Sequence, residues 1–299
     1  MTDRLVELGG VPALGSVYAR TVLSSGRLGV QRRLGRAPAP AAGGGAVLHV
    51  GGVRVDATRL TDYQHLVGEP ASDVLPAGFV HAITFPVAMA LMSSADFPLP
   101  PLGMVHLSNH VTQSRGVRVG DELDVRAWAR DVRPHRSGTQ VDLVAQVRVD
   151  GDVVWTGVST YLAKGVTARE QPGGATDDER EPFVAPVPTG RWQLAANTGR
   201  RYAAVSGDRN PIHLSALAAK AFGFPRAIAH GMYTAARALA DVGAARGEAY
   251  VWTVEFAKPV LLPSSPSVRV APDGDGFAYT AWRPGSSGPH LTGRVDPLR

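Results

Sequence analysis

The amino-acid sequence predicts an α+β protein of two similar halves, each with one longer helix and several strands. Each half contains one apolar segment long enough for a helix, at residues 77–92 and 231–245. Each half also contains short runs in which apolar and polar residues alternate, as in strands with one buried face. The chain has 299 residues, of which 44% are hydrophobic, so it can bury the core of one large or two ordinary domains.

The clearest strand signals lie at the end of the first half. Alternate positions from Val141 to Val149 are apolar, the turn-forming pair Asp150 and Gly151 follows, and residues 153–162 form a second strand-like run. These features predict a β-hairpin. Further alternating runs cover residues 121–131, 251–256, 267–271 and 277–282.

Two segments poor in hydrophobic pattern divide the chain. Residues 37–45 (APAPAAGGG) cannot pack a core and read as a linker. We therefore predict an N-terminal appendage and linker (1–45), a first unit (46–164), a second linker (165–187) and a second unit (188–299).

The N-terminal appendage combines a short predicted helix with a basic run. The helix is expected within residues 11–23, and arginines are frequent in residues 27–36. Two interpretations stay open: a basic arm that docks a partner, or a segment that lies on the body or frays, and we favour the second.

Composition excludes several classes of function. The chain has no cysteine, which excludes thiol catalysis, cysteine-ligated zinc, iron–sulfur clusters and disulfides. The longest apolar stretch, residues 77–92, is too short to span a bilayer, and the first ten residues lack a signal-peptide pattern, so we expect a soluble cytoplasmic protein. The net charge of +5 is spread among acidic residues without a basic stripe, so we expect no nucleic acid as partner.

A weak internal repeat indicates where the chemistry lies. YQHLVG (residues 63–68) matches YAAVSG (residues 202–207), and each precedes a predicted central helix. Tyr63 precedes His81 by 18 residues, whereas Tyr202 precedes His230 by 28. The second half therefore carries ten extra residues between two similar markers.

The inserted stretch has the features of a helix start with a carboxylate beside it. Asn210 is a favoured N-cap and Pro211 is favoured at the first helical position. His213 then lies in the first turn, where the positive end of the helix dipole favours the neutral imidazole that a general base requires. Asp208 lies just before the cap. We expect Asp208 and His213 to converge on one small substrate.

A second element, residues 227–232, leads into the second central helix. Gly231 lies near the start of that helix, where its N–H can approach a carbonyl oxygen and stabilise negative charge on it. The other interpretation is that Gly231 only allows close packing of helix on sheet. We expect His230 to hold the loop through a hydrogen bond rather than to act on substrate.

Two linked segments resemble one known family. Residues 202–213 (YAAVSGDRNPIH) resemble the hydratase 2 motif, which marks the R-specific enoyl hydratases and the MaoC-like dehydratases, and residues 222–232 (FGFPRAIAHGM) resemble its companion segment. The first half is similar to the non-catalytic half of double hot-dog (3R)-hydroxyacyl thioester dehydratases of the mycobacterial HtdX type, in residues 75–92, 97–98 and 105–113. The resemblance implies a double hot-dog fold, in which an antiparallel sheet wraps a long central helix in each half.

The resemblance also implies roles for the residues of the second half. Asp208 and His213 become the catalytic pair, and the Gly231 N–H becomes the group that binds the thioester oxygen. We assign α-proton transfer to His213 and the holding and protonation of the hydroxyl group to Asp208, although the two can share or exchange these roles. Asn210 is assigned to capping and to fixing the loop.

The first half departs from the motif, which implies one active site per chain. Glu69 takes the place of Asp208, and Val74 takes the place of His213. Pro86 should kink or shorten the first central helix. We hypothesise that the freed space is an acyl tunnel lined by Phe85, Met89 and Met92, while ordinary core packing of these three residues is the alternative.

The predicted activity is therefore a (3R)-hydroxyacyl thioester dehydratase, or R-specific trans-2-enoyl thioester hydratase, of fatty-acid metabolism. The substrate would be an acyl-CoA or a thioester of acyl carrier protein, and no metal or redox cofactor is expected because the thioester itself acidifies the α-position. Pairing of two double hot-dog chains as a homodimer stays open. The alternatives are a hot-dog protein that binds or hydrolyses acyl thioesters, or a non-catalytic subunit of a lipid-biosynthetic complex.

Overall fold

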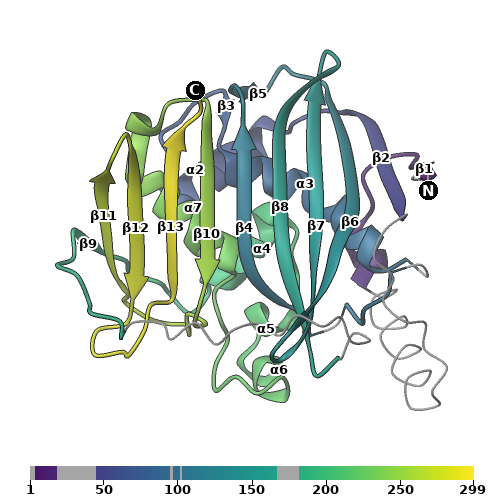
Figure 1. Cartoon of the computed structure of the whole chain (residues 1–299). Coiled ribbons are helices and arrows are strands. Elements are labelled where there is room, and N and C mark those ends of the chain that lie inside the picture. The colour runs from purple at the N-terminus through teal and green to yellow at the C-terminus, as the bar shows by residue number, and fades with distance from the viewer. Residues whose placement is uncertain (1–3, 19–44, 95–96, 102, 167–181) are drawn as a thin grey trace.

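One continuous sheet of eleven strands runs through the computed structural model, which describes residues 4–18, 45–94, 97–101, 103–166 and 182–299 (Figure 1). The strand order is β1-β2-β6-β7-β8-β4-β10-β13-β12-β11-β9. The first half contains β1 (Arg4–Glu7), β2 (Ala46–Val53), α2 (Ala57–Val67), β3 (Val74–Leu75), α3 (Ala77–Met92), β4 (Val105–Gln113), β5 (Val117–Arg118), β6 (Leu123–His135), β7 (Gly138–Val149) and β8 (Asp152–Lys164). The second half contains β9 (Gly190–Arg191), α4 (Thr198–Ser206), α5 (Pro211–Leu214), α6 (Ala216–Ala221), α7 (Gly231–Val242), the 3₁₀ helix η1 (Gly243–Arg246), β10 (Tyr250–Phe256), β11 (Ser267–Asp273), β12 (Gly276–Trp282) and β13 (Leu291–Pro297).

The predicted strands and hairpin are confirmed. β7 and β8 pair antiparallel, with Val149 opposite Asp152 across the turn. Asp150 adopts a positive φ of 52° there, a conformation that aspartate tolerates better than most side chains. The alternating runs of the sequence lie in β6, β10, β11 and β12.

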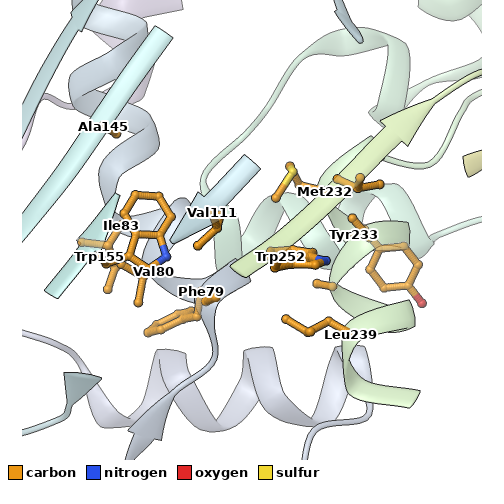
Figure 2. Close-up of a cluster of buried hydrophobic side chains, with 14 of the residues drawn as sticks. Phe79, Val80, Ile83, Val111, Ala145, Trp155, Met232, Tyr233, Leu239 and Trp252 are labelled. Carbon is orange, nitrogen blue, oxygen red and sulfur yellow. The ribbon is translucent and has the colours of Figure 1, made fainter. Parts of the chain in front are cut away.

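The two halves join through the antiparallel pair β4 and β10, in which Val111 lies opposite Trp252. Both residues are fully buried. Figure 2 shows Trp252 of β10 beside α7 and Trp155 of β8 beside α3, with Val111 between them. The indole N–H of Trp252 donates to the Tyr279 hydroxyl at 2.7 Å, which satisfies the polar edge of the buried ring. The sheet junction therefore lies inside one hydrophobic core that both halves share.

The helices α2, α3, α4 and α7 lie behind the sheet in the view of Figure 1, and α3 and α7 are the central helices of the two halves. The prediction of a helix at 77–92 is confirmed, and it continues past Pro86 to Met92 instead of being shortened. The second predicted helix, expected at residues 231–245, is shorter in the structure. α7 ends at Val242, and the 3₁₀ helix η1 follows it. α3 is buried on almost all of its surface, so apolar residues occur on every face of this helix.

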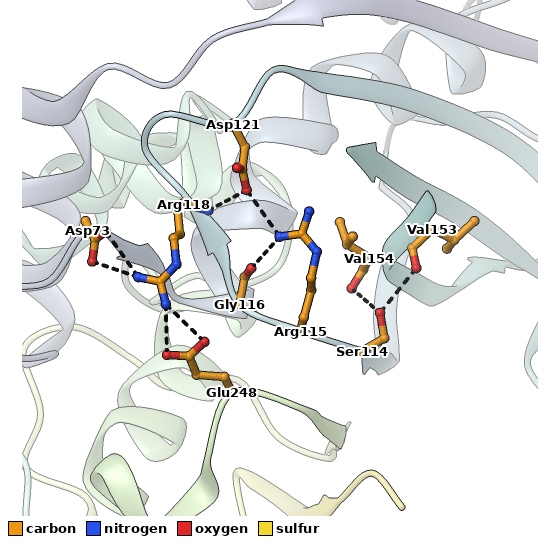
Figure 3. A network of polar contacts seen from close by, with 9 residues as sticks. All are labelled: Asp73, Ser114, Arg115, Gly116, Arg118, Asp121, Val153, Val154 and Glu248. Atoms are coloured by element: carbon orange, nitrogen blue, oxygen red, sulfur yellow. Dashed lines mark hydrogen bonds and ion pairs between the residues drawn. The ribbon is translucent and has the colours of Figure 1, made fainter. Parts of the chain in front are cut away.

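A network of polar contacts links the turn after β4 to the second half (Figure 3). Arg118 pairs with Asp73 at 3.1 Å and with Glu248 at 3.4 Å. The side-chain amide of Gln113 donates to the Glu248 carbonyl at 2.8 Å. Because the Arg118 pairs are exposed, they contribute little stability, and the buried Gln113 contact is the firmer link.

The N-terminal residues lie on the body of the protein. β1 pairs parallel with β2 at the edge of the sheet, residues 14–18 are helical, and Val17 is buried. The last five residues of the predicted helix at 11–23, the basic run at 27–36 and nearly all of the linker at 37–45 fall outside the described residues. No helix within the part of the chain that the structure describes has both the length and the apolar character needed to cross a membrane.

Candidate active site

The loop between α4 and α5 carries the predicted catalytic carboxylate. α4 ends at Gly207, whose left-handed φ of 81° turns the chain sharply before Asp208. The predicted start of a helix is confirmed, because Asn210 caps α5 by accepting the Ile212 N–H at 3.4 Å and Pro211 takes the first helical position. In Figure 1, α5 and the following α6 project beyond the ends of the strands.

Asp208 is held by hydrogen bonds on one of its carboxylate oxygens. Its Oδ1 accepts the Asn210 N–H at 3.1 Å and a short hydrogen bond from the Tyr18 hydroxyl. Burial raises the pKa of Asp208, but the imidazoles of His230 and His213 and these two hydrogen bonds outweigh it, so the pKa lies below its usual value. Asp208 is therefore ionised near neutral pH, with its side chain 23% exposed.

Two histidines stack beside this carboxylate. The ring centroids of His213 and His230 lie 3.7 Å apart. Nδ1 of His213 lies 2.9 Å from the Ile228 carbonyl oxygen, and Nε2 of His230 lies 2.9 Å from the Asp208 carbonyl oxygen. Because a carbonyl oxygen only accepts, both of these ring nitrogens carry a proton. The hydrogen bond of His230 ties its ring to the loop, as expected.

Burial and these hydrogen bonds set the protonation state of the two imidazoles. Burial lowers the pKa of His213 although Asp208 opposes the shift, and burial together with His213 lowers the pKa of His230 to about 3. Both rings are therefore neutral near pH 7. With its proton on Nδ1, neutral His213 has an unprotonated Nε2, which is the atom that a general base needs.

Gly231 begins α7, directly after its N-cap residue His230. The first N–H groups of a helix have no partner within the helix, and among the described residues no acceptor takes the Gly231 N–H. A Cβ atom at this position would lie 3.1 Å from the Phe256 ring. The site therefore shows both features that the sequence left as alternatives: an available N–H donor and a close approach that favours glycine.

Asp208, His213 and His230 also offer one atom each within 4.8 Å of one another, a spacing that suits a metal ion. Hydrogen bonds engage one polar atom of each side chain and leave the other available, an arrangement that suits a metal ligand as well as a group that transfers a proton. Oδ1 of Asp208 already accepts two donors, and one nitrogen of each imidazole donates to a carbonyl.

A narrow cavity lies beside the first central helix and has about 10 Å³ of free space, roughly one water molecule. Phe85 and Met92, two of the three residues of the tunnel hypothesis, line it. Met89 does not line it and packs in the core instead. The complete lining consists of His81, Thr84, Phe85, Ala88, Met92, Leu143, Ala145, Gly157, Ser159 and Tyr161.

Aromatic rings connect this cavity to the start of α7 at Gly231. His106 stacks on Tyr161 at 4.5 Å between ring centroids and lies 5.0 Å from Phe256, the residue that packs on Gly231. His81 lies 6.3 Å from His106. Sequence reasoning missed this aromatic group because His81, His106, Tyr161 and Phe256 come from four different elements, α3, β4, β8 and β10. No local motif joins them.

Tyr18 is the other residue of the site that sequence reasoning missed. It belongs to the appendage that the composition separates from the body, yet it contacts Asp208 directly. The one signal that could have pointed to it is the short apolar helix expected around it.

The fold is that of the double hot-dog proteins. Residues 179–276 match the model of the MaoC-like domain. A Mycobacterium tuberculosis protein described as having a double hot-dog fold superposes with a TM-score of 0.50 at 15% identity, covering 82% of this chain and 93% of that one.

Relatives with higher sequence identity show the family to which the chain belongs. The 3-hydroxyacyl-thioester dehydratase X of Mycobacterium tuberculosis is 39% identical over 244 residues, which are 82% of this chain and 86% of the relative. The crystal structure of HtdX from the same organism superposes with a TM-score of 0.73 at 38% identity and covers 84% of this chain and 100% of that one. The chain belongs to the MaoC-like dehydratases, which are enzymes of the hydro-lyase class.

Proposed function

We propose that this enzyme interconverts (3R)-3-hydroxyacyl thioesters and trans-2-enoyl thioesters at one site formed by Asp208, His213 and Gly231. The observation that carries the proposal is the convergence of an ionised carboxylate with a neutral histidine whose Nε2 is unprotonated. The similarity to a 3-hydroxyacyl-thioester dehydratase supports it.

The three groups account for every proton in the dehydration. Nε2 of His213 removes the α-proton, and the electron pair moves toward the thioester oxygen, where the Gly231 N–H stabilises the growing negative charge. The bond from the β-carbon to the hydroxyl group then breaks. The proton taken by His213 leaves with that hydroxyl group as water, and Asp208 holds the hydroxyl group and relays the proton. Both residues return to their starting state, and hydration follows the same steps in reverse.

The charge around the catalytic loop supports a substrate carried on phosphopantetheine. Between Asp208 and Asp241 the sequence has no acidic residue. Arg209, Lys220 and Arg226 are exposed in this stretch. Positive groups at the rim suit the phosphates of coenzyme A and equally an acidic carrier protein. We therefore infer an acyl thioester of either carrier as the substrate.

The test is hydration of trans-2-enoyl-CoA thioesters of increasing chain length, followed by loss of the conjugated thioester absorbance, with the product's configuration determined. Asp208→Asn and His213→Ala should each lower kcat by about 10²–10⁴-fold, the usual contribution of general acid–base groups. Asp152→Asn and His65→Ala, which change exposed residues on β8 and α2, are matched controls and should retain activity.

Three outcomes would contradict the proposal. A (3S) product would exclude the assigned stereochemistry. Release of free thiol without hydration would show a thioesterase. No turnover with either CoA or acyl carrier protein substrates would favour a binding or structural role.

A further inference from the structure

The N-terminal residues run from the edge of the first half to the catalytic loop of the second. After β1, the Leu8 N–H donates to the His49 carbonyl at 2.9 Å, which holds the segment against β2. Residues 14–18 then form a helical turn whose Val17 is only 2% exposed. Ser93, at the end of α3, contacts the Val17 carbonyl at 3.5 Å. The segment is therefore packed against the body where the two halves meet.

This packing reaches the turn that positions Asp208. A Cβ atom at Gly207 would lie 2.6 Å from Cδ1 of Leu14, and Gly207 has a φ of 81° that L side chains rarely adopt. The glycine thus permits both the left-handed turn and the close approach of Leu14.

The two oxygens of the Asp208 carboxylate have different surroundings. Oδ1 accepts hydrogen bonds from the Tyr18 hydroxyl and the Asn210 N–H. Oδ2 lies 3.7 Å from Nε2 of His230, beyond hydrogen-bond distance, and accepts no hydrogen bond from the residues that the structure describes. The carboxylate is thus fixed by one oxygen, and the other is available to a hydroxyl group or a water molecule.

We propose that Tyr18 is a positioning residue: its hydroxyl holds Oδ1 of Asp208 so that Oδ2 is presented to the substrate. The inference rests on the proposed function and adds a residue from the N-terminal segment to its active site. Tyr18 need not be displaced during the reaction, because it occupies the oxygen that the substrate does not use.

The protonation state of Tyr18 agrees with this role. Burial and the negative charge of Asp208 raise the pKa of Tyr18 well above its usual value, so its hydroxyl keeps its proton near neutral pH and can donate it in a hydrogen bond. The same hydrogen bond helps to lower the pKa of Asp208.

The decisive variant is Tyr18→Phe, which removes the hydroxyl group and keeps the ring. We expect kcat to fall by about tenfold to a hundredfold, as for loss of a hydrogen bond to a charged group, with KM nearly unchanged. The acid limb of the kcat profile should move to higher pH, because the ionised carboxylate has lost a donor. Val17→Ala is the control: it removes packing beside Tyr18 and should lower Tm without moving the pH profile.

A measurement independent of turnover separates the two proposals. The carboxyl carbon resonance of Asp208, assigned as the signal missing from Asp208→Asn, should titrate at higher pH in Tyr18→Phe than in the parent. If the parent is inactive with every substrate, the proposed function fails, while this titration still decides whether Tyr18 holds the carboxylate.

Two results would overturn the inference about Tyr18. Unchanged kcat, pH profile and Asp208 titration in Tyr18→Phe would show that the contact has no effect. A rise in kcat/KM would show that the hydroxyl blocks the site instead of positioning Asp208.

Discussion

In both halves of the protein a helix ends at a left-handed glycine and a carboxylate follows. Gly68 ends α2 before Glu69, and Gly207 ends α4 before Asp208, each with a φ of 81°. The surroundings of the two carboxylates differ. Glu69 has a side chain only 3% exposed, and both of its oxygens accept hydrogen bonds from Nη2 of Arg246 at 2.9 Å.

Arg246 lies on η1 of the second half, so Glu69 joins the two halves through a buried ion pair. Burial would lower the pKa of Arg246, but Glu69 and Tyr250 raise it above its ordinary value. Among the residues that the structure describes, no arginine pairs with Asp208, and burial keeps the two histidines beside it neutral. In both halves the same backbone turn presents a carboxylate. Glu69 is neutralised by a buried arginine and joins the halves, whereas Asp208 has no such partner among the described residues and, under the proposed function, acts on the substrate.

The largest expected effect concerns the first residues of the two central helices, where the two halves also differ. α3 begins with a fully buried Ala77, whereas α7 begins with Gly231, which is partly exposed and has an available N–H. Gly231→Pro removes this N–H at a position where proline suits a helix, and His230 has the extended conformation that a following proline requires. If the N–H stabilises the thioester oxygen, kcat should fall by about 10²–10³-fold.

Gly231→Ala is the matched control for the added atoms. It keeps the N–H and brings a Cβ to 3.1 Å from the Phe256 ring, which must move slightly. A loss of kcat in Gly231→Ala as large as that in Gly231→Pro would show that close packing, and not the donor, explains the glycine.

The structural role assigned to Glu69 predicts a loss of stability without a loss of chemistry. Glu69→Gln leaves the buried Arg246 without its counter-charge, and the free energy of unfolding should fall by about 3 kcal/mol. The kcat of the folded variant should stay near that of the parent. Urea unfolding and steady-state kinetics on the same preparations measure both.

The opposite pattern in Glu69→Gln would break the comparison. A kcat as low as that of Asp208→Asn, with stability unchanged, would place chemistry in the first half as well.

The features that the sequence predicted correctly depend on residues close together in the chain. The start of α5 at Asn210 and Pro211, the turn between β7 and β8, and the position of α3 each follow from a few neighbouring residues. Cap and turn residues act locally, so their effect is visible in the sequence itself.

The features that sequence reasoning missed join distant segments. Tyr18 and Asp208 are 190 residues apart, and Glu69 and Arg246 are 177 apart. The tunnel hypothesis grouped Phe85, Met89 and Met92, of which Phe85 and Met92 line the cavity and Met89 does not. Because α3 is apolar all round, its sequence does not indicate which residues face the cavity.

The smallest expected effect concerns the buried histidines, which occur in both halves. Burial lowers the pKa of His81 to about 4 and that of His106 to about 3 in the first half, as it does for His230 in the second. The unfolded chain, with histidine pKa values near 6.5, binds more protons between pH 6.5 and about 4, so stability must fall as the pH falls through this range. Each such histidine should cost about 2 kcal/mol of stability between pH 7 and pH 5.

His106→Phe tests this effect in the first half, where no proposed chemistry depends on the residue. Phenylalanine can keep the stacking on Tyr161 and leaves no unpartnered polar atom at the position of the buried Nε2. Urea unfolding at pH 7 and pH 5 should show that the variant loses about 2 kcal/mol less than the parent on acidification. An equal loss in both proteins would show that His106 keeps an ordinary pKa in the folded state, and the acid sensitivity would then come from other buried histidines such as His81 and His230.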